Sequence, residues 1–435
     1  MTKLVFHLGD KKTGSTAIQT TMALRAWTCD SVKLGYPTSG KVSHIGLAKS
    51  LQTRGQAASD PGRLRAVAEN LKEVTDEIHA TKPDVALISA EHFEEVDPAE
   101  LRDAIQEHLP EFAPDARFIA YVRPHADRLA SSYSERIKQG IFWGTIEDLH
   151  EQFLANGKLL YSPRFTKWRS VFGSQFELRP FVRDLLFRND VVADLLQFAL
   201  QTDDFQLHPT EHANESVSLE NLTLLRRLQT YLRDRNPTVQ PHQAAFGWAM
   251  ARRMNASPLG TGTKVQLHRS LAESVLANYR DDAVALDAGF FKGTPMTTAI
   301  VAAPGKAVAE AQSINAEDHY SARELQLVDI FLDQIAALTN ADPRYWGHLL
   351  RDQHRAVMQA KSLKPEESGI VRSRKVGPKR AGGVGGKPGG GKKGGRKAGA
   401  GNAGPAKAAT GKLRLGAAAA RKKAMRSKST IGSEE

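Results

Sequence analysis

The chain has 435 residues, of which 41% are hydrophobic and 25% charged, so it contains enough apolar material for a sizeable folded core. Its single cysteine, Cys29, excludes an internal disulfide framework and a multi-cysteine zinc or iron–sulfur site. Residues 371–435 carry 18 Lys and Arg against 2 acidic residues, a charge of about +16, whereas the whole chain has a net charge of +12. The first 370 residues therefore sum to about −4, which weakens any inference that the globular part binds nucleic acid.

Strand and helix signals alternate along the first 200 residues. Short apolar runs predict strands, and apolar residues at helical spacing between them predict helices. Because such alternation is typical of parallel sheets covered on both faces, we expect an α/β fold with a P-loop-type parallel sheet flanked by helices. In chain order the predicted elements are strand 3–8, helix 15–27, helix 61–80, strand 84–89, helix 98–109 capped by Asp97, strand 117–122, helix 125–138 and strand 175–181.

The pattern becomes mainly helical from about Ser216 onward. Beyond this region the chain is built from Gly, Ala, Lys, Arg and Pro, and such a composition cannot bury enough surface to offset its ordering entropy. An Ala- and Lys-rich stretch near 413–425 could still form a helix on a partner. We expect helices at 219–235, 240–254, 267–279 and 322–338, and three parts: an α/β domain over 1–210, a helical region over 211–360 and a disordered basic tail over 361–435.

The most informative segment is the loop in LVFHLGDKKTGSTAIQ, residues 4–19. In this segment a strand is followed by a Gly-containing loop and by the beginning of a helix. Backbone N–H groups then point into one concavity, which favours the binding of an anion. Gly14 allows close backbone approach, Ser15 and Thr16 can cap the helix or contact phosphate, and Lys12 supplies positive charge. The segment is not a Walker A motif, because Ser15 occupies the position of the lysine. The alternative interpretation is a Gly-Ser-Thr turn with surface lysines.

Two segments resemble the motifs of sulfotransferases that use 3′-phosphoadenosine 5′-phosphosulfate (PAPS). Bacterial, carbohydrate-type members commonly carry H-I-G-x-x-K-T-G-T-T, and this chain has H-L-G-D-K-K-T-G-S-T from His7. The family's 3′-phosphate motif places an Arg at a strand end and a Ser eight residues later, as Arg123 and Ser131 stand here. The alternative for Arg123 is a strand-end ion pair with a carboxylate such as Asp127. The resemblance spans about residues 1–235.

The resemblance implies transfer of a sulfuryl group from PAPS to a hydroxyl or amine of a carbohydrate or lipid-linked acceptor. The product would be adenosine 3′,5′-bisphosphate (PAP), and no metal is expected. The helical region would complete or cover the acceptor side. In this scheme Lys12 acts on the leaving oxygen, Arg123 and Ser131 hold the 3′-phosphate, and the 5′-phosphate is held by Lys12, Thr13, Gly14, Ser15 and Thr16.

A general base is needed for the acceptor, and Glu91 is the first candidate. It follows the strand DVALIS, at the sheet edge where open α/β proteins bind ligands, and a Glu fills this role in glycan-modifying relatives. His44 and His92 are the rival candidates. Each has a structural alternative: Glu91 as an ion-pair partner of Lys12 or Arg123, and either histidine as an ordinary loop residue.

Two other functions fit parts of the sequence: a P-loop nucleotide kinase, and a non-catalytic polyanion-binding protein that uses the basic tail. The tail suits an anionic membrane surface or another polyanion. Sequence-specific nucleic-acid binding is not expected, because the tail has no aromatic residues on which bases could stack. Without an apolar run long enough to span a bilayer or a secretory signal, we expect a cytoplasmic protein, with a peripheral position at the inner membrane surface as the alternative.

Overall fold

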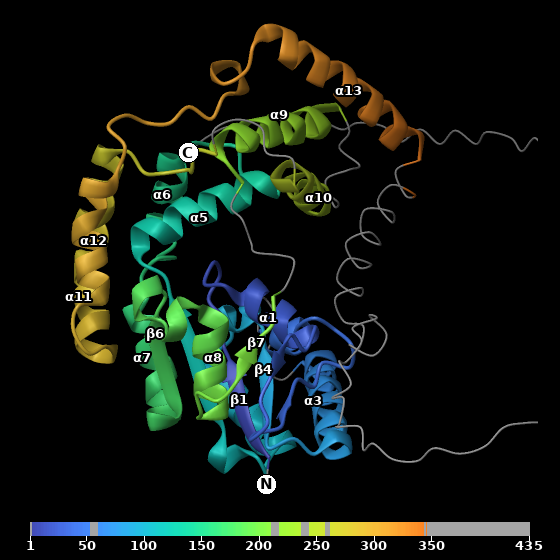
Figure 1. Cartoon of the computed structure of the whole chain (residues 1–435), viewed down its shortest axis with the longest axis vertical. Coiled ribbons are helices and arrows are strands. Elements are labelled where there is room, and N and C mark those ends of the chain that lie inside the picture. The colour runs from blue at the N-terminus through green and yellow to red at the C-terminus, as the bar shows by residue number, and fades with distance from the viewer. Residues whose placement is uncertain are drawn as a thin grey trace, which may run out of the picture. The chain divides into compact units, whose positions relative to one another are not determined.

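The computed structural model describes residues 2–52, 60–209, 217–235, 243–256, 262–342 and 345 (Figure 1). These residues belong to one compact unit, Met1–Arg372. The tail predicted over 361–435 and its helix near 413–425 lie outside the described residues. The boundaries predicted at 210 and 360 stay a prediction.

Five parallel strands form the central sheet, which confirms the predicted α/β class. Their order is β3-β4-β1-β5-β6, so β1 lies between β4 and β5. Phe6 of β1 is in register with Ile88 on one side and Phe118 on the other. The strands are β1 Lys3–His7, β3 Leu34–Gly35, β4 Val85–Ser89, β5 Arg117–Val122 and β6 Phe176–Pro180, and a separate antiparallel ribbon pairs β2 Trp27–Thr28 with β7 Gln206–Leu207.

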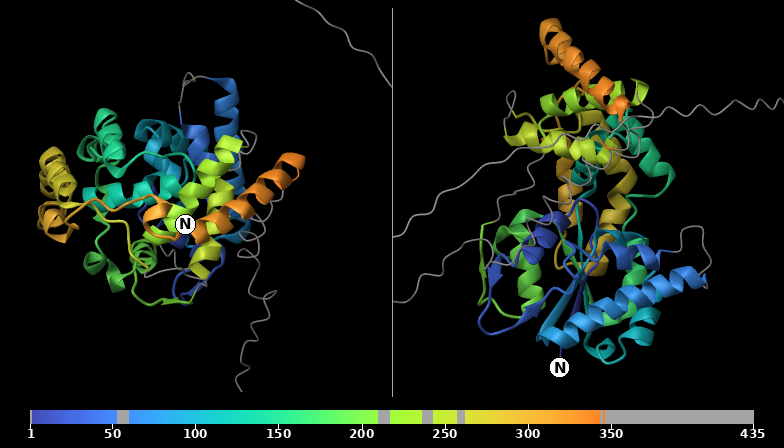
Figure 2. Two further views of the ribbon diagram at one scale, coloured as in Figure 1. Left: turned by 90° about the horizontal axis from the view of Figure 1, so that it is seen from above. Right: turned by 90° about the vertical axis from the view of Figure 1, so that its right-hand side faces the viewer.

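Helices cover both faces of the sheet (Figure 2). Successive side chains of a strand point to opposite faces, so Leu4 and Phe6 enter one core cluster with α2, α3, α4 and α7. Val5 enters a second cluster with α1 and α8. The helices are α1 Ser15–Ala23, α2 Ile45–Leu51, α3 Pro61–Thr81, α4 Pro98–His108, α5 His125–Lys138, α6 Ile146–Ala155, α7 Ser162–Phe172, α8 Val191–Leu200, α9 Leu219–Arg235, α10 Gln243–Ala256, α11 Arg269–Phe290, α12 Pro295–Lys306 and α13 Ala322–Ala341.

Two predicted helix ends differ from the structure by more than three residues. The helix expected over 15–27 ends at Ala23, because Arg25 has a left-handed backbone (φ 51°) and the chain then joins the ribbon with β7. The helix expected over 267–279 continues to Phe290, because Ala283 and Leu286 extend its buried stripe. The predicted Asp97 cap is confirmed, since its Oδ1 accepts from the N–H of Ala99 at 3.0 Å.

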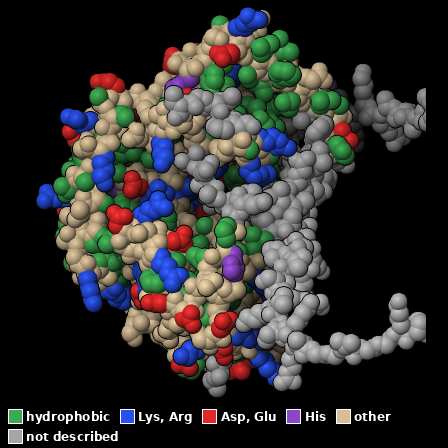
Figure 3. All heavy atoms as spheres, in the orientation of Figure 1, with side chains coloured by type: hydrophobic (Ala, Val, Ile, Leu, Met, Phe, Trp, Pro, Cys, Tyr) green, Lys and Arg blue, Asp and Glu red, His purple; other side chains and the backbone are tan. Residues whose placement is uncertain are grey.

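Helix α5 joins the sheet to the helical region. Its buried Leu129, Tyr133 and Ile137 belong to the same cluster as Leu222 of α9 and Ala251 of α10. No helix among the described residues is long and apolar enough to cross a membrane. Figure 3 shows basic and acidic side chains interspersed over one face, as expected for a part of the chain with a small net charge.

Candidate functional site

The candidate site lies at the carboxyl edge of the parallel sheet. The loop with Lys12 follows β1, Glu91 opens a 3-10 turn (η1, Glu91–Glu95) after β4, and Arg123 follows β5. The connection from β4 to β5 passes over β1. Open α/β sheets bind ligands at such an edge, where neighbouring connections diverge.

The loop after β1 closes on its own backbone. Lys12 has a left-handed backbone (φ 68°), which is rare for a residue other than glycine and is common at functional sites. The Thr13 hydroxyl donates to the Asp10 carbonyl at 2.6 Å, and the Ser15 hydroxyl donates to it at 3.5 Å. Gly14 is the N-cap of α1, and none of the side chains that the structure describes caps this helix. The backbone N–H groups at its start and the exposed Thr16 are therefore available to an anion.

Gly9 brings this loop close to Glu91. It has φ +50°, and a Cβ there would lie 2.6 Å from the Glu91 Cα, so only glycine allows this approach. Burial raises the pKa of Glu91, although the nearby charges of Lys11 and Lys12 oppose the shift. Glu91 forms no ion pair within 4 Å with any residue that the structure describes. A poorly solvated carboxylate beside the loop can take up a proton during a reaction.

The second motif meets the first at Lys12. Arg123 Nη1 donates to the Lys12 carbonyl at 3.1 Å, and its guanidinium lies 5.7 Å from the centre of the Phe181 ring. The described side chains of Arg123 and Asp127 form no direct ion pair within 4 Å, although the Asp127 charge opposes the lowering of the Arg123 pKa by burial. Ser131 lies on α5 one turn before Glu135, whose carboxylate contacts the Lys12 ammonium at 3.0 Å.

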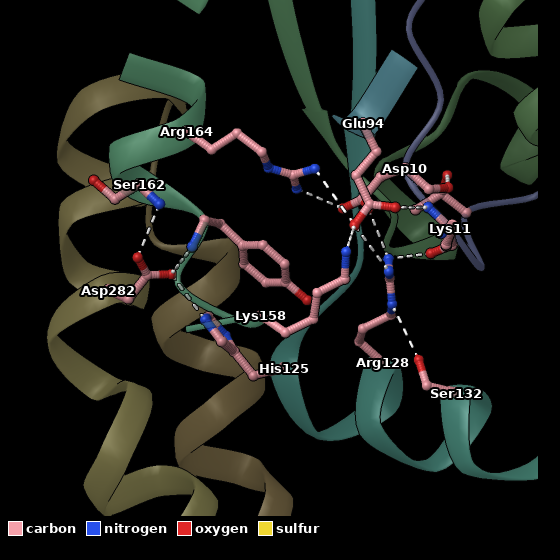
Figure 4. A network of polar contacts seen from close by, with 12 residues as sticks. Asp10, Lys11, Glu94, His125, Arg128, Ser132, Lys158, Ser162, Arg164 and Asp282 are labelled. Atoms are coloured by element: carbon pink, nitrogen blue, oxygen red, sulfur yellow. Dashed lines mark hydrogen bonds and ion pairs between the residues drawn. The ribbon is translucent and has the colours of Figure 1, made fainter. Parts of the chain in front are cut away.

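A buried ionic network holds the loop from behind (Figure 4). Asp10 is fully buried and binds Arg128 at 2.9 Å and Arg164 at 3.0 Å. Glu94 accepts from the backbone N–H of Lys11 at 3.2 Å and pairs with Lys158 at 2.8 Å. Arg128 also donates to the Lys11 carbonyl. The network therefore links the loop to η1, α5 and α7, which restrains its shape.

The structure gives His44 a packing role. It is buried, its Nε2 contacts the Pro37 carbonyl at 2.9 Å, and its Nδ1 contacts the backbone of Ser89. Burial lowers the pKa of His44 to about 4. Both ring nitrogens are engaged, so among the candidate bases His44 is disfavoured relative to Glu91. The carbonyl of His92 accepts from Gln52 at 2.9 Å.

Sequence reasoning did not single out Asp10, Arg128 or Glu135. A partial signal was present for Glu135, since it follows Ser131 at i+4 and must share its helix face. Asp10 stands inside the loop that resembles a phosphate-binding loop, where an acidic residue is unexpected unless a cation pairs with it. No comparable signal connected Arg128 to Asp10, because their pairing depends on the tertiary fold.

The described residues contain no group of three or more His, Cys, Asp or Glu side chains that could hold a metal ion. Comparison of the sequence with protein families finds no match, and comparison with curated proteins finds none either. Among solved structures, a sulfotransferase from Alicyclobacillus acidocaldarius is similar with a TM-score of 0.32 and 16% identity, over 52% of this chain and 91% of that chain. A likeness at this level establishes neither a family nor an activity.

Proposed function

We propose that this protein is a PAPS-dependent sulfotransferase that acts on a hydroxyl or amine of a carbohydrate or lipid-linked acceptor. The observation that carries the proposal is the meeting of two anion-binding motifs. The uncapped start of α1 and Lys12 form one, and Arg123 from the neighbouring strand bonds directly to the backbone of Lys12. A donor with two separate phosphate groups suits such a pair of motifs.

The proposed roles follow from these positions. The N–H groups at the start of α1, with Thr16, bind the 5′-phosphate, and Arg123 with Ser131 binds the 3′-phosphate. The acceptor oxygen or nitrogen attacks sulfur, the bond from sulfur to the bridging oxygen breaks, and the acceptor proton passes to Glu91. Lys12 offsets the negative charge that develops on the leaving oxygen of PAP.

The proposal is tested by measuring PAP formation from PAPS with a panel of carbohydrate and glycolipid acceptors. We expect Lys12→Ala to lower kcat by about 10²- to 10³-fold, the usual effect of removing one group that stabilises transition-state charge. PAP affinity should change less, because the phosphates keep their other partners. The matched control is Lys72→Ala, which removes an exposed ammonium that pairs with Asp76 at 2.6 Å. Equal rates in the wild-type chain and Lys12→Ala would exclude the proposed role.

A further inference from the structure

The Glu135 carboxylate is fully engaged beside the candidate site. Its Oε2 accepts from Lys12 at 3.0 Å and from Lys138 at 2.5 Å. Its Oε1 accepts from Gln139 at 2.7 Å and from the indole N–H of Trp248 at 2.9 Å. A carboxylate with this set of donors has little freedom to rotate, so it presents Oε2 to Lys12 in a fixed direction.

The Glu135 carboxylate favours the charged form of Lys12. Burial lowers the pKa of the Lys12 ammonium, and the nearby Lys138 lowers it further, whereas Glu135 and Glu91 raise it. Burial also penalises the Glu135 carboxylate, but the charges of Lys12 and Lys138 outweigh that penalty and hold the pKa of Glu135 well below its ordinary value. Glu135 is therefore ionised at neutral pH and stabilises the charged form of Lys12.

Helix α10 is packed tightly enough to fix the Trp248 contact. A Cβ at Gly247 would lie 1.8 Å from the Lys138 carbonyl, so the backbone of α10 touches the end of α5. Gln229 of α9 donates to that carbonyl at 3.1 Å and to the Gln243 carbonyl at 3.0 Å. These contacts place the indole of Trp248 on Glu135, and they connect the helical region to the loop that carries Lys12.

We propose that Glu135 is a positioning residue for sulfuryl transfer, which keeps the Lys12 ammonium charged and in place and ties it through Trp248 to helix α10. The inference rests on the proposed function, because it assigns Lys12 the role of stabilising the leaving oxygen. Glu135 acts through Lys12, and Trp248 acts through Glu135. Neither Glu135 nor Trp248 therefore needs to touch the donor or the acceptor.

The test compares two variants of the full chain whose expected effects have opposite signs. Glu135→Gln keeps the shape but removes the negative charge, so Lys12 should lose its proton at lower pH. Lys138→Met removes a competing cation, so Lys12 should lose its proton at higher pH. The control is Glu73→Gln, which removes an exposed carboxylate paired with Lys41 at 2.7 Å. The pH dependence of Lys12 acylation, followed by mass spectrometry, reports this titration without requiring any enzyme activity.

Two further readouts separate positioning from a structural role. The alkaline limb of the pH–rate profile for PAP formation from PAPS should move with the Lys12 titration. It should move to lower pH in Glu135→Gln and to higher pH in Lys138→Met. PAP affinity in Glu135→Gln should be equal or tighter, because the variant removes a negative charge near an anion, whereas a damaged site would bind PAP more weakly.

The inference is overturned if the Lys12 titration in Glu135→Gln matches the Glu73→Gln control, or if the alkaline limb does not follow it. If Glu135→Gln fails to fold, a folded Lys138→Met variant in which Lys12 titrates at higher pH than in the wild-type chain still supports the inference. Failure of the proposed function gives a different result, the absence of PAP binding by the wild-type chain.

Discussion

Replacing Asp10 with Asn should destabilise the fold strongly, although the two side chains have the same shape. Asp10 is fully buried and pairs with Arg128 at 2.9 Å and with Arg164 at 3.0 Å. Removing one partner of a buried ion pair typically costs about 3–5 kcal/mol, because the remaining charge stays desolvated. Glu94 lies 3.4 Å from Arg128 and 3.6 Å from Arg164 and still offsets part of their charge. We therefore expect a loss of about 3 kcal/mol, at the lower end of that range.

The assay is urea denaturation followed by circular dichroism, which gives the free energy of unfolding. Asp76→Asn serves as the control, since it breaks an exposed pair with Lys72 at 2.6 Å and should cost no more than about 0.5 kcal/mol. If Asp10→Asn and Asp76→Asn lose the same stability, the buried network does not hold the loop, and this part of the reasoning is refuted.

Two substitutions distinguish the candidate bases. Glu91→Gln should lower kcat by about 10²- to 10⁴-fold, as expected for loss of a general base, with little change in the melting temperature. Because burial raises the pKa of Glu91, wild-type activity should fall with decreasing pH sooner than for an exposed carboxylate, and this acid limb should disappear in Glu91→Gln. His44→Ala should instead lower stability by about 1–3 kcal/mol through unpaired backbone groups at Ser89 and Pro37. An inactive but fully stable His44→Ala, together with an active Glu91→Gln, would reverse the assignment of the base.

The strands and the positions of the motifs were predictable because local patterns determine them. The apolar runs before His7 and after Arg117 define β1 and β5, and parallel pairing then brings the residues after both strands to one edge. The Lys12–Arg123 contact follows from that geometry together with the two motifs. Helix α8 was missed because only Asp194 and Gln197 interrupt its apolar residues, which is too few to mark a polar face with a helical period.

The charges behind the loop could not be predicted in the same way. Arg128 stands on a predicted helix, yet the sequence does not show that its side chain reaches the buried Asp10, 118 residues away along the chain. The contact of Trp248 with Glu135 joins helices more than 100 residues apart and depends on how α10 packs on α5. Such partners are set by tertiary packing, which no local pattern encodes.

The most direct test of the central claim is calorimetric titration of the purified chain with PAP, with ATP as the comparison ligand. We predict a dissociation constant for PAP that is roughly micromolar, and much weaker binding of ATP, which lacks a 3′-phosphate. Arg123→Ala should weaken PAP binding by about tenfold to a hundredfold, the range for a hydrogen bond to a charged group. Arg102→Ala, which alters an exposed arginine paired with Asp103, should bind PAP as the wild type does. A folded chain that binds no PAP, or binds it equally well without Arg123, would contradict the account.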